Sequence, residues 1–440
     1  MNTHVTEQTR FVFVSNYLNH HQIPFCNAMY ELWEGSFVFV QTEAMEQERV
    51  QMGWGNQISQ PYLKLYYEEP AECRTLIAEA EVVLFGGCDD ESYIEERLGQ
   101  GRPVIRYCER LYKTGQWKAI SPRGLKKKYY DHTRHRNSPV YLLCAGAYVP
   151  SDFAIIRAYS GKMFCWGYFP ETKRYDVEEL LAGKGGREKG VPHLLWAARM
   201  IDWKHPELPL ETARYLKEKG HAFHMDIIGG GEMEERIKAV RAEYGLENEV
   251  SLRGFLPPEQ VRTYMERADI YLITSDRQEG WGAVVNEAMN SACAVLVDHM
   301  VGAAPYLIED GENGLIYRDG NREELFALAE RLVTDRELCA RLGREAYRTI
   351  TETWNAENAA ESLTRLCGRL GIAEGKSFVG SGMPAGKDEH TAESAGANTQ
   401  SADEKGSERW RAAPCAPAPV IAERKMYTLL KRKERKEDRP

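Results

Sequence analysis

The sequence predicts an α/β protein made of two doubly wound, parallel-sheet domains in tandem. Short apolar runs alternate with longer segments of helical pattern almost throughout the 440 residues. The runs fall into two series, and residues 167–190 between them contain a proline and several glycines that interrupt any regular pattern. Hydrophobic residues make up 43% of the chain and charged residues 28%, which is typical of globular domains.

The first series predicts the strands of an N-terminal domain, residues 1–168. Each run is too short to be a helix, and its unbroken apolar character predicts a strand buried on both faces of a sheet. The segments between the runs are long enough for the crossover helices that parallel strands require. The runs are Phe11–Val14, Phe37–Val40, Val82–Phe85, Val104–Tyr107 and Tyr141–Leu143.

The second series predicts a similar sheet in a domain that spans residues 169–345. Its runs are Leu194–Ala197, His224–Ile228, Val250–Leu252, Ile270–Ile273, Ala294–Val297 and Leu315–Tyr317. Thr334 and Glu337 then predict a capping box at the start of a further helix. Residues 376–440 are expected to form a disordered tail with a basic end, because few large apolar residues remain to offset the entropy of ordering.

Composition and charge exclude several classes of protein. No run approaches the ~18 consecutive apolar residues of a membrane-spanning helix, and the first residues lack the pattern of a signal peptide. The ten cysteines stand singly without a CxxC, which argues against a zinc clip and favours a reducing cytoplasm. The net charge of −9 argues against general nucleic-acid binding. We therefore expect a cytoplasmic protein without a nucleic-acid partner.

The most informative stretch is Ser275–Asn290, which follows a predicted strand and leads into a predicted helix. Gly280 and Gly282 let the backbone approach a ligand closely, and the start of the helix offers N–H groups to an anion. Glu279 lies in the loop and Glu287 lies in the helix, so both carboxylates can face one site at different depths. A pair of solvated charges is the alternative interpretation.

Two cations follow the first strand of the second domain. Arg199 and Lys204 belong to the stretch ARMIDWK, residues 198–204. Ligands bind outside the carboxyl ends of the strands in open α/β sheets, and a guanidinium with an ammonium suits a diphosphate. Taken alone, such a pair is more often a pair of surface charges.

Together these stretches resemble glycosyltransferase family 4, the glycosyl transferases group 1, which are retaining, nucleotide-sugar-dependent enzymes of the GT-B fold. The matching stretches are ARMIDWK at 198–204, DIIGGGE at 226–232, GFLPPEQV at 254–261, EGWGAVVNEAM at 279–289, GAAPYLIEDGENGLIY at 302–317 and WNAENAAESLTRL at 354–366. The resemblance implies two Rossmann-like domains that face a cleft. It also implies terminal helices, residues 346–372, that return to pack on the first domain.

The resemblance further implies the chemistry of the site. Lys204 and Arg199 would neutralise the departing diphosphate, and Glu279 would contact the transferred sugar. The implied donor-binding residues are Glu287, for the ribose hydroxyls, and Gly280, Trp281, Gly282, Ala283, Gly229, Gly230, Phe255 and Leu256. Retention could proceed by double displacement with a glutamate nucleophile or by front-face substitution, and the sequence does not choose between them.

Four residues are the acceptor-side candidates. His20 and His21 follow the first strand, and Glu109 and Arg110 follow the strand Val104–Tyr107. The same topology would bring both pairs to the predicted cleft. Residues 15–25 depart from the family pattern because they lack its paired glycines.

No D-x-D triplet occurs in the sequence, so we expect a metal-independent enzyme. No cofactor is implied, because the nucleotide-sugar is a co-substrate. His132 and His135 form an HxxH without a third ligand in evidence, and we interpret them as a surface pair.

Residues 121–136 carry six Lys or Arg, one Asp and two adjacent tyrosines. Such a run is usually a solvated face, but basic and aromatic residues together also suit an anionic membrane, here the inner face of the plasma membrane. The predicted partners are accordingly a nucleotide-sugar donor, a saccharide or lipid-linked acceptor, and this membrane surface. The predicted process is the synthesis of cell-surface polysaccharide or glycoconjugate.

Two other functions are compatible with the same architecture: a catalytically degenerate GT-B partner or scaffold protein, and a nucleotide-sugar epimerase. A degenerate member would be expected to lose a phosphate-binding cation or a glutamate, whereas this chain keeps Arg199, Lys204, Glu279 and Glu287. This favours the enzyme.

Overall fold

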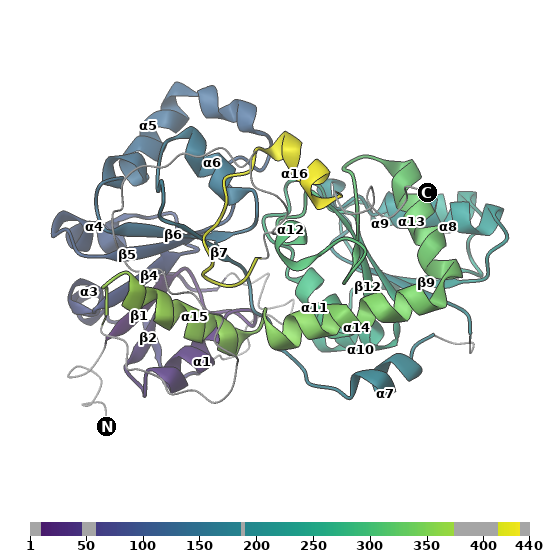
Figure 1. The fold of residues 1–440 in the computed structure, drawn as a ribbon, viewed down its shortest axis with the longest axis horizontal. Helices are drawn as coiled ribbons and strands as arrows, with labels where there is room; N and C mark the ends of the chain where they lie inside the picture. Colours follow the sequence, from purple (N-terminus) through teal and green to yellow (C-terminus); the bar gives the residue numbers. More distant parts are fainter. Residues whose placement is uncertain (1–9, 46–58, 186–189, 374–411, 432–440) are drawn as a thin grey trace, which may run out of the picture.

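The structure is a computed structural model that describes residues 10–45, 59–185, 190–373 and 412–431. Two parallel sheets lie side by side, each between layers of helices (Figure 1). The first sheet has seven strands in the order β3-β2-β1-β4-β5-β6-β7, and the second has six in the order β10-β9-β8-β11-β12-β13. Each order reverses once, beside β1 and β8, which makes both sheets doubly wound.

The first sheet consists of β1 (Phe11–Ser15), β2 (Phe37–Gln41), β3 (Leu63–Leu65), β4 (Val82–Gly86), β5 (Val104–Cys108), β6 (Val140–Ala145) and β7 (Met163–Trp166). Its connections contain α1 (Ile23–Leu32), α3 (Pro70–Glu79), α4 (Ser92–Gly99), η1 (Gln116–Ile120), α5 (Pro122–Asp131), η2 (Thr133–His135) and α6 (Val149–Ile155).

The second sheet consists of β8 (His193–Ala197), β9 (His224–Ile228), β10 (Val250–Gly254), β11 (Ile270–Ile273), β12 (Ala294–Asp298) and β13 (Leu315–Tyr317). The helices around it are α7 (Val177–Ala182), η3 (Asp202–Lys204), α8 (Glu207–Glu218), α9 (Glu234–Glu243), α10 (Pro258–Arg267), α11 (Val284–Asn290), α12 (Ala304–Leu307), α13 (Arg322–Thr334) and α14 (Arg336–Glu352). They are followed by α15 (Ala356–Arg369) and α16 (Glu423–Leu430).

Every apolar run that was predicted as a strand is a strand, which confirms the α/β class. The prediction lacks only the two edge strands of the first sheet. β3 has the sequence LKL and is half-buried, so its apolar signal is weak. β7 is a short strand that ends just before Gly167, where the irregular stretch was placed. Incomplete burial explains the weak pattern of β3, whereas the four residues of β7, MFCW, are apolar and mostly buried.

The capping box predicted from Thr334 and Glu337 is wrong. Thr334 ends α13, where its hydroxyl donates a hydrogen bond to the Glu330 carbonyl at 2.8 Å. Asp335 caps α14 instead, because its carboxylate accepts a hydrogen bond from the Leu338 N–H at 2.9 Å. Since α14 runs unbroken through residue 345, the boundary placed there falls inside a helix.

α15 carries the chain back to the first domain. It lies against α1, and Trp33 Nε1 donates a hydrogen bond to Thr364 Oγ1 at 3.0 Å (Figure 1). This is the contact between the terminal helix and the first domain that the resemblance implies.

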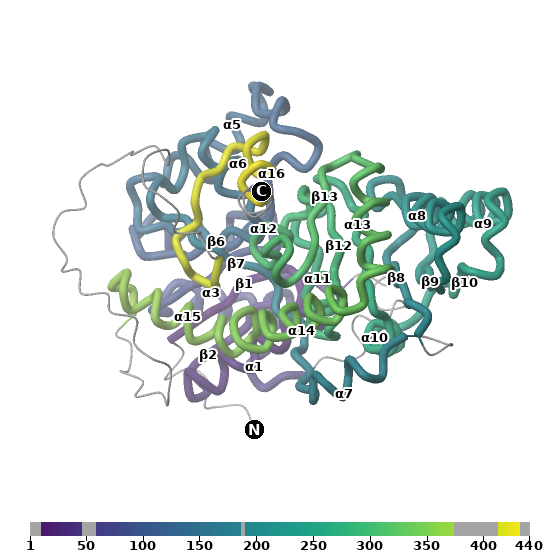
Figure 2. The backbone as a smooth tube through the Cα atoms, turned by 45° about the vertical axis from the view of Figure 1, so that its right-hand side comes forward, coloured from purple at the N-terminus to yellow at the C-terminus, as the bar shows by residue number. Residues whose placement is uncertain are grey.

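Residues 412–431 contradict the expectation of a disordered tail, while residues 376–411 and 432–440 lie outside the described residues. Cys415 N–H donates to the Cys165 carbonyl at 2.9 Å, and Ala418 N–H donates to the Met163 carbonyl at 3.0 Å. Residues 415–418 thus pair with the edge strand β7. The chain then forms α16, which lies near α6 of the first domain and α12 of the second (Figures 1 and 2).

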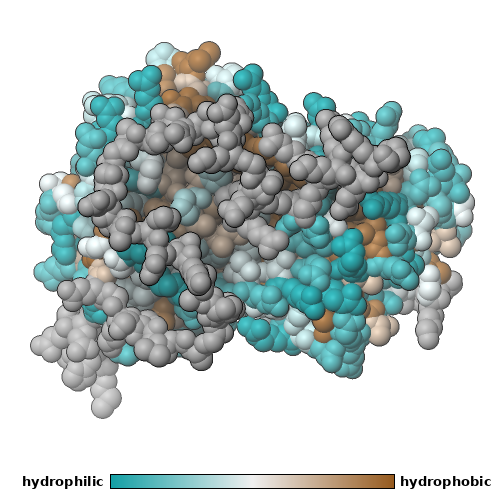
Figure 3. Space-filling model, in the orientation of Figure 1, coloured by the Kyte–Doolittle hydropathy of each residue, from teal (hydrophilic) through white to brown (hydrophobic). Residues whose placement is uncertain are grey.

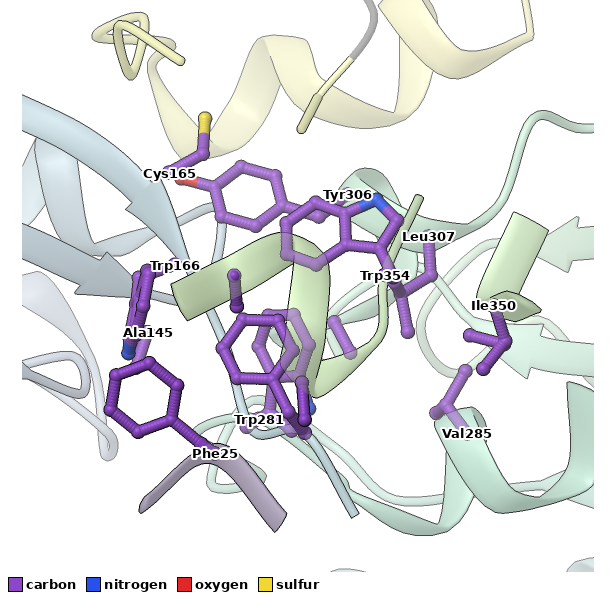
Figure 4. Close-up of a cluster of buried hydrophobic side chains, with 14 of the residues drawn as sticks. Phe25, Ala145, Cys165, Trp166, Trp281, Val285, Tyr306, Leu307, Ile350 and Trp354 are labelled. Carbon is purple, nitrogen blue, oxygen red and sulfur yellow. The ribbon is translucent and has the colours of Figure 1, made fainter. Parts of the chain in front are cut away.

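One hydrophobic core extends across both domains. Phe25 and Trp166 from the first domain lie on one side of it, and Trp281 and Trp354 lie on the other (Figure 4). The ring centroids of Phe169 and Trp354 are 6.2 Å apart in a stacked arrangement. The junction between the two domains is therefore packed as a protein interior. Within the described ranges, no helix has the length and apolar character needed to cross a bilayer.

Candidate functional site

The carboxyl ends of the two sheets meet at the domain junction. Ala147 N–H, just beyond β6, donates to the Gly302 carbonyl at 3.0 Å. The Gly280 carbonyl lies between Gly146 and Gly302, and a Cβ atom at either glycine would collide with it. The loop that was predicted to hold the donor is therefore fixed at this junction by backbone contacts from both domains.

Lys204 and Glu279 form an ion pair at the carboxyl edge of the second sheet. Each side chain is only 13% exposed, and Lys204 Nζ lies 4.5 Å from the centre of the Trp203 ring. The Asp276 N–H donates to the Trp203 carbonyl at 3.0 Å, so η3 and the loop after β11 are joined. A diphosphate that binds Lys204 would have to compete with Glu279 for the ammonium group.

Arg199, two residues after β8, is exposed, and none of the hydrogen bonds or ion pairs found among the described residues involves its side chain. The loop that carries it lies against the glycine turn after β9, where Met200 N–H donates to the Gly230 carbonyl at 2.8 Å. Gly229 has φ of 137° and packs on the Ala198 carbonyl, with no room for a side chain. The two loops together leave the Arg199 guanidinium free to approach an anion.

Glu287 lies in the first turn of α11 and is half-buried. Burial raises the pKa of its carboxyl group, and the charge of Arg262 opposes the rise. Burial and the nearby carboxylate of Glu287, with a smaller effect of Glu279, also raise the pKa of Tyr271.

Phe255 and Leu256 follow β10 at the same edge of the sheet. Phe255 is 59% exposed, and Leu256 is partly buried against the core. An exposed aromatic ring at the carboxyl end of a strand offers a face on which a nucleobase can stack.

Glu109 brings the first domain to the donor loop. Its carboxylate accepts hydrogen bonds from the Tyr168 hydroxyl at 2.6 Å and from Lys113 Nζ at 2.5 Å. The same carboxylate lies directly against Gly280, where a Cβ atom would collide with it. Of the acceptor-side candidates, Glu109 thus lies next to the predicted catalytic loop.

Arg110 is buried, and its partners are acidic. Its Nη2 donates to Glu423 at 2.7 Å, and Nε lies 3.6 Å from the carboxylate of Asp152. The rings of His20 and His21 lie against one another in a tilted arrangement, with centroids 3.8 Å apart. Burial lowers the pKa of both rings, and the pKa of His21 falls to about 3, so both are neutral at pH 7.

The structure corrects the prediction for Trp281. Its side chain is 0% exposed, and Nε1 donates to Asn286 Oδ1 at 2.9 Å. The indole belongs to the aromatic cluster at the junction, beside Trp354 (Figure 4). A donor could reach only its backbone, whereas Gly280, Gly282 and Ala283 carry no large side chain.

One group of possible metal ligands is found among the described residues: His193, His224 and Asp226, whose ligand atoms lie within 4.8 Å of one another. It lies near the amino ends of β8 and β9, away from the donor loop. Arg253 Nε also donates to Asp226 at 2.6 Å, so a cation would meet a guanidinium there. His132 is not a surface residue, because it is buried against Tyr159, whose hydroxyl lies 2.9 Å from its Nδ1.

Two further charged groups in this region, His205 and Arg277, were not predicted from the sequence. His205, in the left-handed conformation with φ of 49°, lies between Asp276 and Glu207 at 3.7 and 3.2 Å. The carboxylates of Asp276 and Glu207 on either side raise the pKa of His205 to about 10. Arg277 lies two residues before Glu279 and contacts Glu423 at 3.3 Å. Both positions lie within or next to the motifs, which is the signal that could have found them.

Residues 178–349 match the family model described as "Glycosyl transferases group 1". These residues are a group 1 glycosyltransferase domain. The chain is 33% identical over 144 residues to the amylovoran biosynthesis glycosyltransferase AmsK of Erwinia amylovora, a match that covers 32% of this chain and 35% of AmsK. It is 27% identical over 184 residues to the putative colanic acid biosynthesis glycosyltransferase WcaL of Salmonella typhimurium, covering 40% of this chain and 45% of WcaL. The chain thus spans less than half the length of these curated relatives.

The group 1 domain and the sheet before it together form a GT-B fold, as solved structures show. Anabaena Alr3699/HepE in complex with UDP superposes with a TM-score of 0.61 at 13% identity, over 82% of this chain and 100% of that one. WaaG, a glycosyltransferase involved in lipopolysaccharide biosynthesis, superposes with a TM-score of 0.53 at 14% identity, over 80% and 98%.

Proposed function

We propose that the protein is a metal-independent, retaining glycosyltransferase that moves a sugar from a nucleoside-diphosphate sugar to a saccharide or lipid-linked acceptor. The observation that carries the proposal is the meeting of Lys204 and Glu279, in the group 1 domain, with Glu109 of the other domain at Gly280. The relatives named for amylovoran and colanic acid biosynthesis support a role in making cell-surface polysaccharide.

The chemistry assigns a role to each charged side chain. As the bond between the sugar and the diphosphate breaks, negative charge grows on the leaving phosphate, and Lys204 and Arg199 would stabilise it. Preorganised charges of this kind usually contribute the largest catalytic effect. Glu279, released from Lys204 by the diphosphate, would contact the sugar, and Glu287 would accept hydrogen bonds from the ribose. Phe255 would stack on the base.

The acceptor would approach from the first domain. Glu109 lies against Gly280 and is held by Tyr168 and Lys113, so its carboxylate is oriented toward the donor loop. We assign it the contact with the acceptor hydroxyl. A cytoplasmic location and contact with the inner face of the plasma membrane complete the proposal, since nucleotide-sugars and lipid-linked acceptors would meet there.

The test is binding followed by turnover. UDP, GDP and ADP are compared by thermal shift, and one of them should raise the melting temperature. At a hundredfold excess over Kd, linkage gives about 2.7 kcal/mol of added stability. The shift should be lost in Lys204→Ala and retained in Lys238→Ala, which removes an exposed lysine that pairs with Glu234 at 2.9 Å.

Turnover of the matching nucleotide-sugar should survive EDTA, and NMR of the first-formed product should show retention of the anomeric configuration. No shift with any of the three nucleotides would contradict the proposed function. Loss of turnover in EDTA would contradict only its metal independence, and an inverted product only its stereochemistry.

A further inference from the structure

Glu423 of α16 joins two arginines that come from different domains. Its Oε2 accepts a hydrogen bond from Arg110 Nη2 at 2.7 Å, and its Oε1 lies 3.3 Å from Arg277 Nη1. Both oxygens of one carboxylate are therefore engaged, one by each domain. We infer that Arg110 and Arg277 form a binding site for an acidic group of the acceptor, and that Glu423 occupies this site until the acceptor displaces it. The inference rests on the proposed function for its acceptor.

The Arg110 side chain is buried and fixed in position, and its guanidinium group keeps an unused hydrogen-bond donor. Its side chain is 1% exposed, its guanidinium lies 5.1 Å from the centre of the Tyr148 ring, and its Nε lies 3.6 Å from the carboxylate of Asp152. Asp152 is itself fixed by the Tyr112 N–H at 3.1 Å and by Gln116 Nε2 at 2.9 Å. Nη1 of Arg110 has no hydrogen-bond partner among the described residues. A buried guanidinium with an unused donor can take a ligand with two or three oxygen atoms better than it takes one oxygen of Glu423.

The second arginine provides the link to the reaction. Arg277 is in the donor loop, two residues before Glu279, and Arg110 directly follows Glu109. Apart from Glu423, the acidic residue nearest to Arg277 is Asp319, whose carboxylate lies 3.9 Å from Nη2, too far for a hydrogen bond. An anion held by both arginines would therefore lie beside the place where the sugar is transferred. A carboxylate fits this position, as Glu423 demonstrates, and a phosphate offers the same oxygen atoms to both guanidinium groups.

α16 is attached in a different way from the segment before it. Residues 415–418 are attached to β7 by backbone hydrogen bonds, whereas α16 is held by side chains. These are Glu423, the buried Met426, Tyr427 with its hydroxyl on Glu324, and Lys431 at 3.0 Å from Asp310. A helix of eight residues has little stability of its own. α16 can thus leave the site while residues 415–418 remain paired.

The experiment compares the binding of three sugars by calorimetry with the full chain. Glucuronate offers a carboxylate, glucose 6-phosphate offers a phosphate, and glucose offers neither. Glu423→Gln removes the competing charge and keeps the shape, so one of the two anions should bind about tenfold more tightly than it binds the unaltered chain. Arg277→Gln in the same background should abolish the gain. Glu361→Gln, which removes an exposed ion pair with Arg365 at 3.1 Å, should gain nothing.

The anion whose affinity increases in Glu423→Gln identifies the acidic group of the acceptor. Glu423→Asp withdraws the carboxylate by one methylene and should give a smaller increase in anion affinity. It replaces Glu423→Gln in the experiment if circular dichroism shows that Glu423→Gln does not fold. Equal binding by glucose, or no gain for either anion, would overturn the inference. UDP, GDP and ADP are titrated in parallel. If a nucleotide binds but neither anion binds Glu423→Gln more tightly, only this inference fails. If an anion binds more tightly but no nucleotide binds, the proposed function fails instead.

Discussion

Lys204 and Glu287 lie at the same edge of the second sheet, but their proposed partners behave differently during the reaction. The diphosphate gains charge as the sugar leaves, whereas the ribose does not change. Lys204→Ala should therefore lower kcat, by analogy with lost oxyanion donors on the order of 10²–10³-fold. Glu287→Ala should remove mostly uniform binding and raise KM more than it lowers kcat.

Steady-state kinetics over a range of donor concentrations up to saturation measure kcat and KM, with Lys238→Ala as the control and circular dichroism as the check of folding. Parental turnover by Lys204→Ala would show that the role given to this lysine is wrong. The proposal would then depend on the two glutamates.

His205 should make stability depend on pH. Its pKa rises from 6.5 to about 10 on folding, because the carboxylates of Asp276 and Glu207 lie on either side of it. A group whose pKa is raised on folding stabilises the protein fully below its unfolded pKa, and this contribution is lost as pH rises through the folded pKa. His205→Asn removes the charge and tolerates the left-handed backbone. The difference in unfolding free energy between the two proteins should be larger at pH 6 than at pH 10, as urea titrations would measure. A difference that does not change over this range would contradict the assignment.

At the scale of elements, α5 lies within the basic stretch 121–136 that the sequence singled out, and η1 directly precedes it. Trp117 and Ile120 are 68% and 80% exposed, and Tyr129 and Tyr130 on α5 are about half exposed. Figure 3 shows hydrophobic atoms at the upper edge of the molecule, where Figure 1 places α5. Exposed aromatic rings among lysines suit the headgroup region of an anionic membrane.

Replacing Lys126, Lys127 and Lys128 together by Gln should therefore weaken sedimentation with anionic vesicles. The expected loss is roughly tenfold or more, at about 1 kcal/mol for each lysine. It is smaller than the full sum because Lys127 already pairs with Asp131 at 2.8 Å. Salt at about 0.5 M should act in the same direction. Replacing Lys217, Lys219 and Lys238 of the second domain is the control. Equal binding to neutral and anionic vesicles would exclude an electrostatic contact.

Elements were predictable where burial is complete. β1, β4 and β11 are covered on both faces, so their residues are almost all apolar and the runs can be recognised without knowing their neighbours. Pairing at an edge leaves no such pattern. Residues 415–418 include Pro417 and have the composition of a tail. They contact β7, which is distant from them in the sequence. The order of residues 412–431 could not be derived from local sequence for this reason.

The site residues, too, were predictable where local sequence decides their position and unpredictable where contacts between distant segments decide it. Motif spacing assigned Arg199, Lys204 and Glu279 to the carboxyl edge of one sheet, and topology alone is enough for that. The Lys204–Glu279 ion pair, the burial of Trp281 and the contact of Glu109 with Gly280 depend on how loops from separate elements pack. Glu423 was outside any prediction, because its partners are two arginines that are distant in the sequence.

At the scale of the whole molecule, Trp354 joins the two domains. It is 1% exposed and lies within 6.2 Å of the ring centres of Phe169, Trp281 and Tyr306. Trp354→Ala should lower the free energy of unfolding by about 3–5 kcal/mol, since the cavity left behind adds to the lost burial. Trp117→Ala, at an exposed position, should change it by less than about 0.5 kcal/mol. Urea denaturation measures both, and similar midpoints for the two variants would show that the junction does not contribute to stability.

The attachment of α15 and residues 415–418 to the first domain has a consequence for how the chain folds as it is synthesised. The hydrogen bond from Trp33 to Thr364 spans 331 residues of sequence, and the contact of Cys165 with Pro417 spans 252. At about 5–20 residues per second, roughly 10–50 s pass between synthesis of β7 and of the segment that covers it. During that time the edge of β7 lacks residues 415–418 and α1 lacks α15. An unpaired strand edge and an exposed helix face both favour misassembly. The second domain can mature in the interval, so the half of the protein that is made first is the half that is finished last.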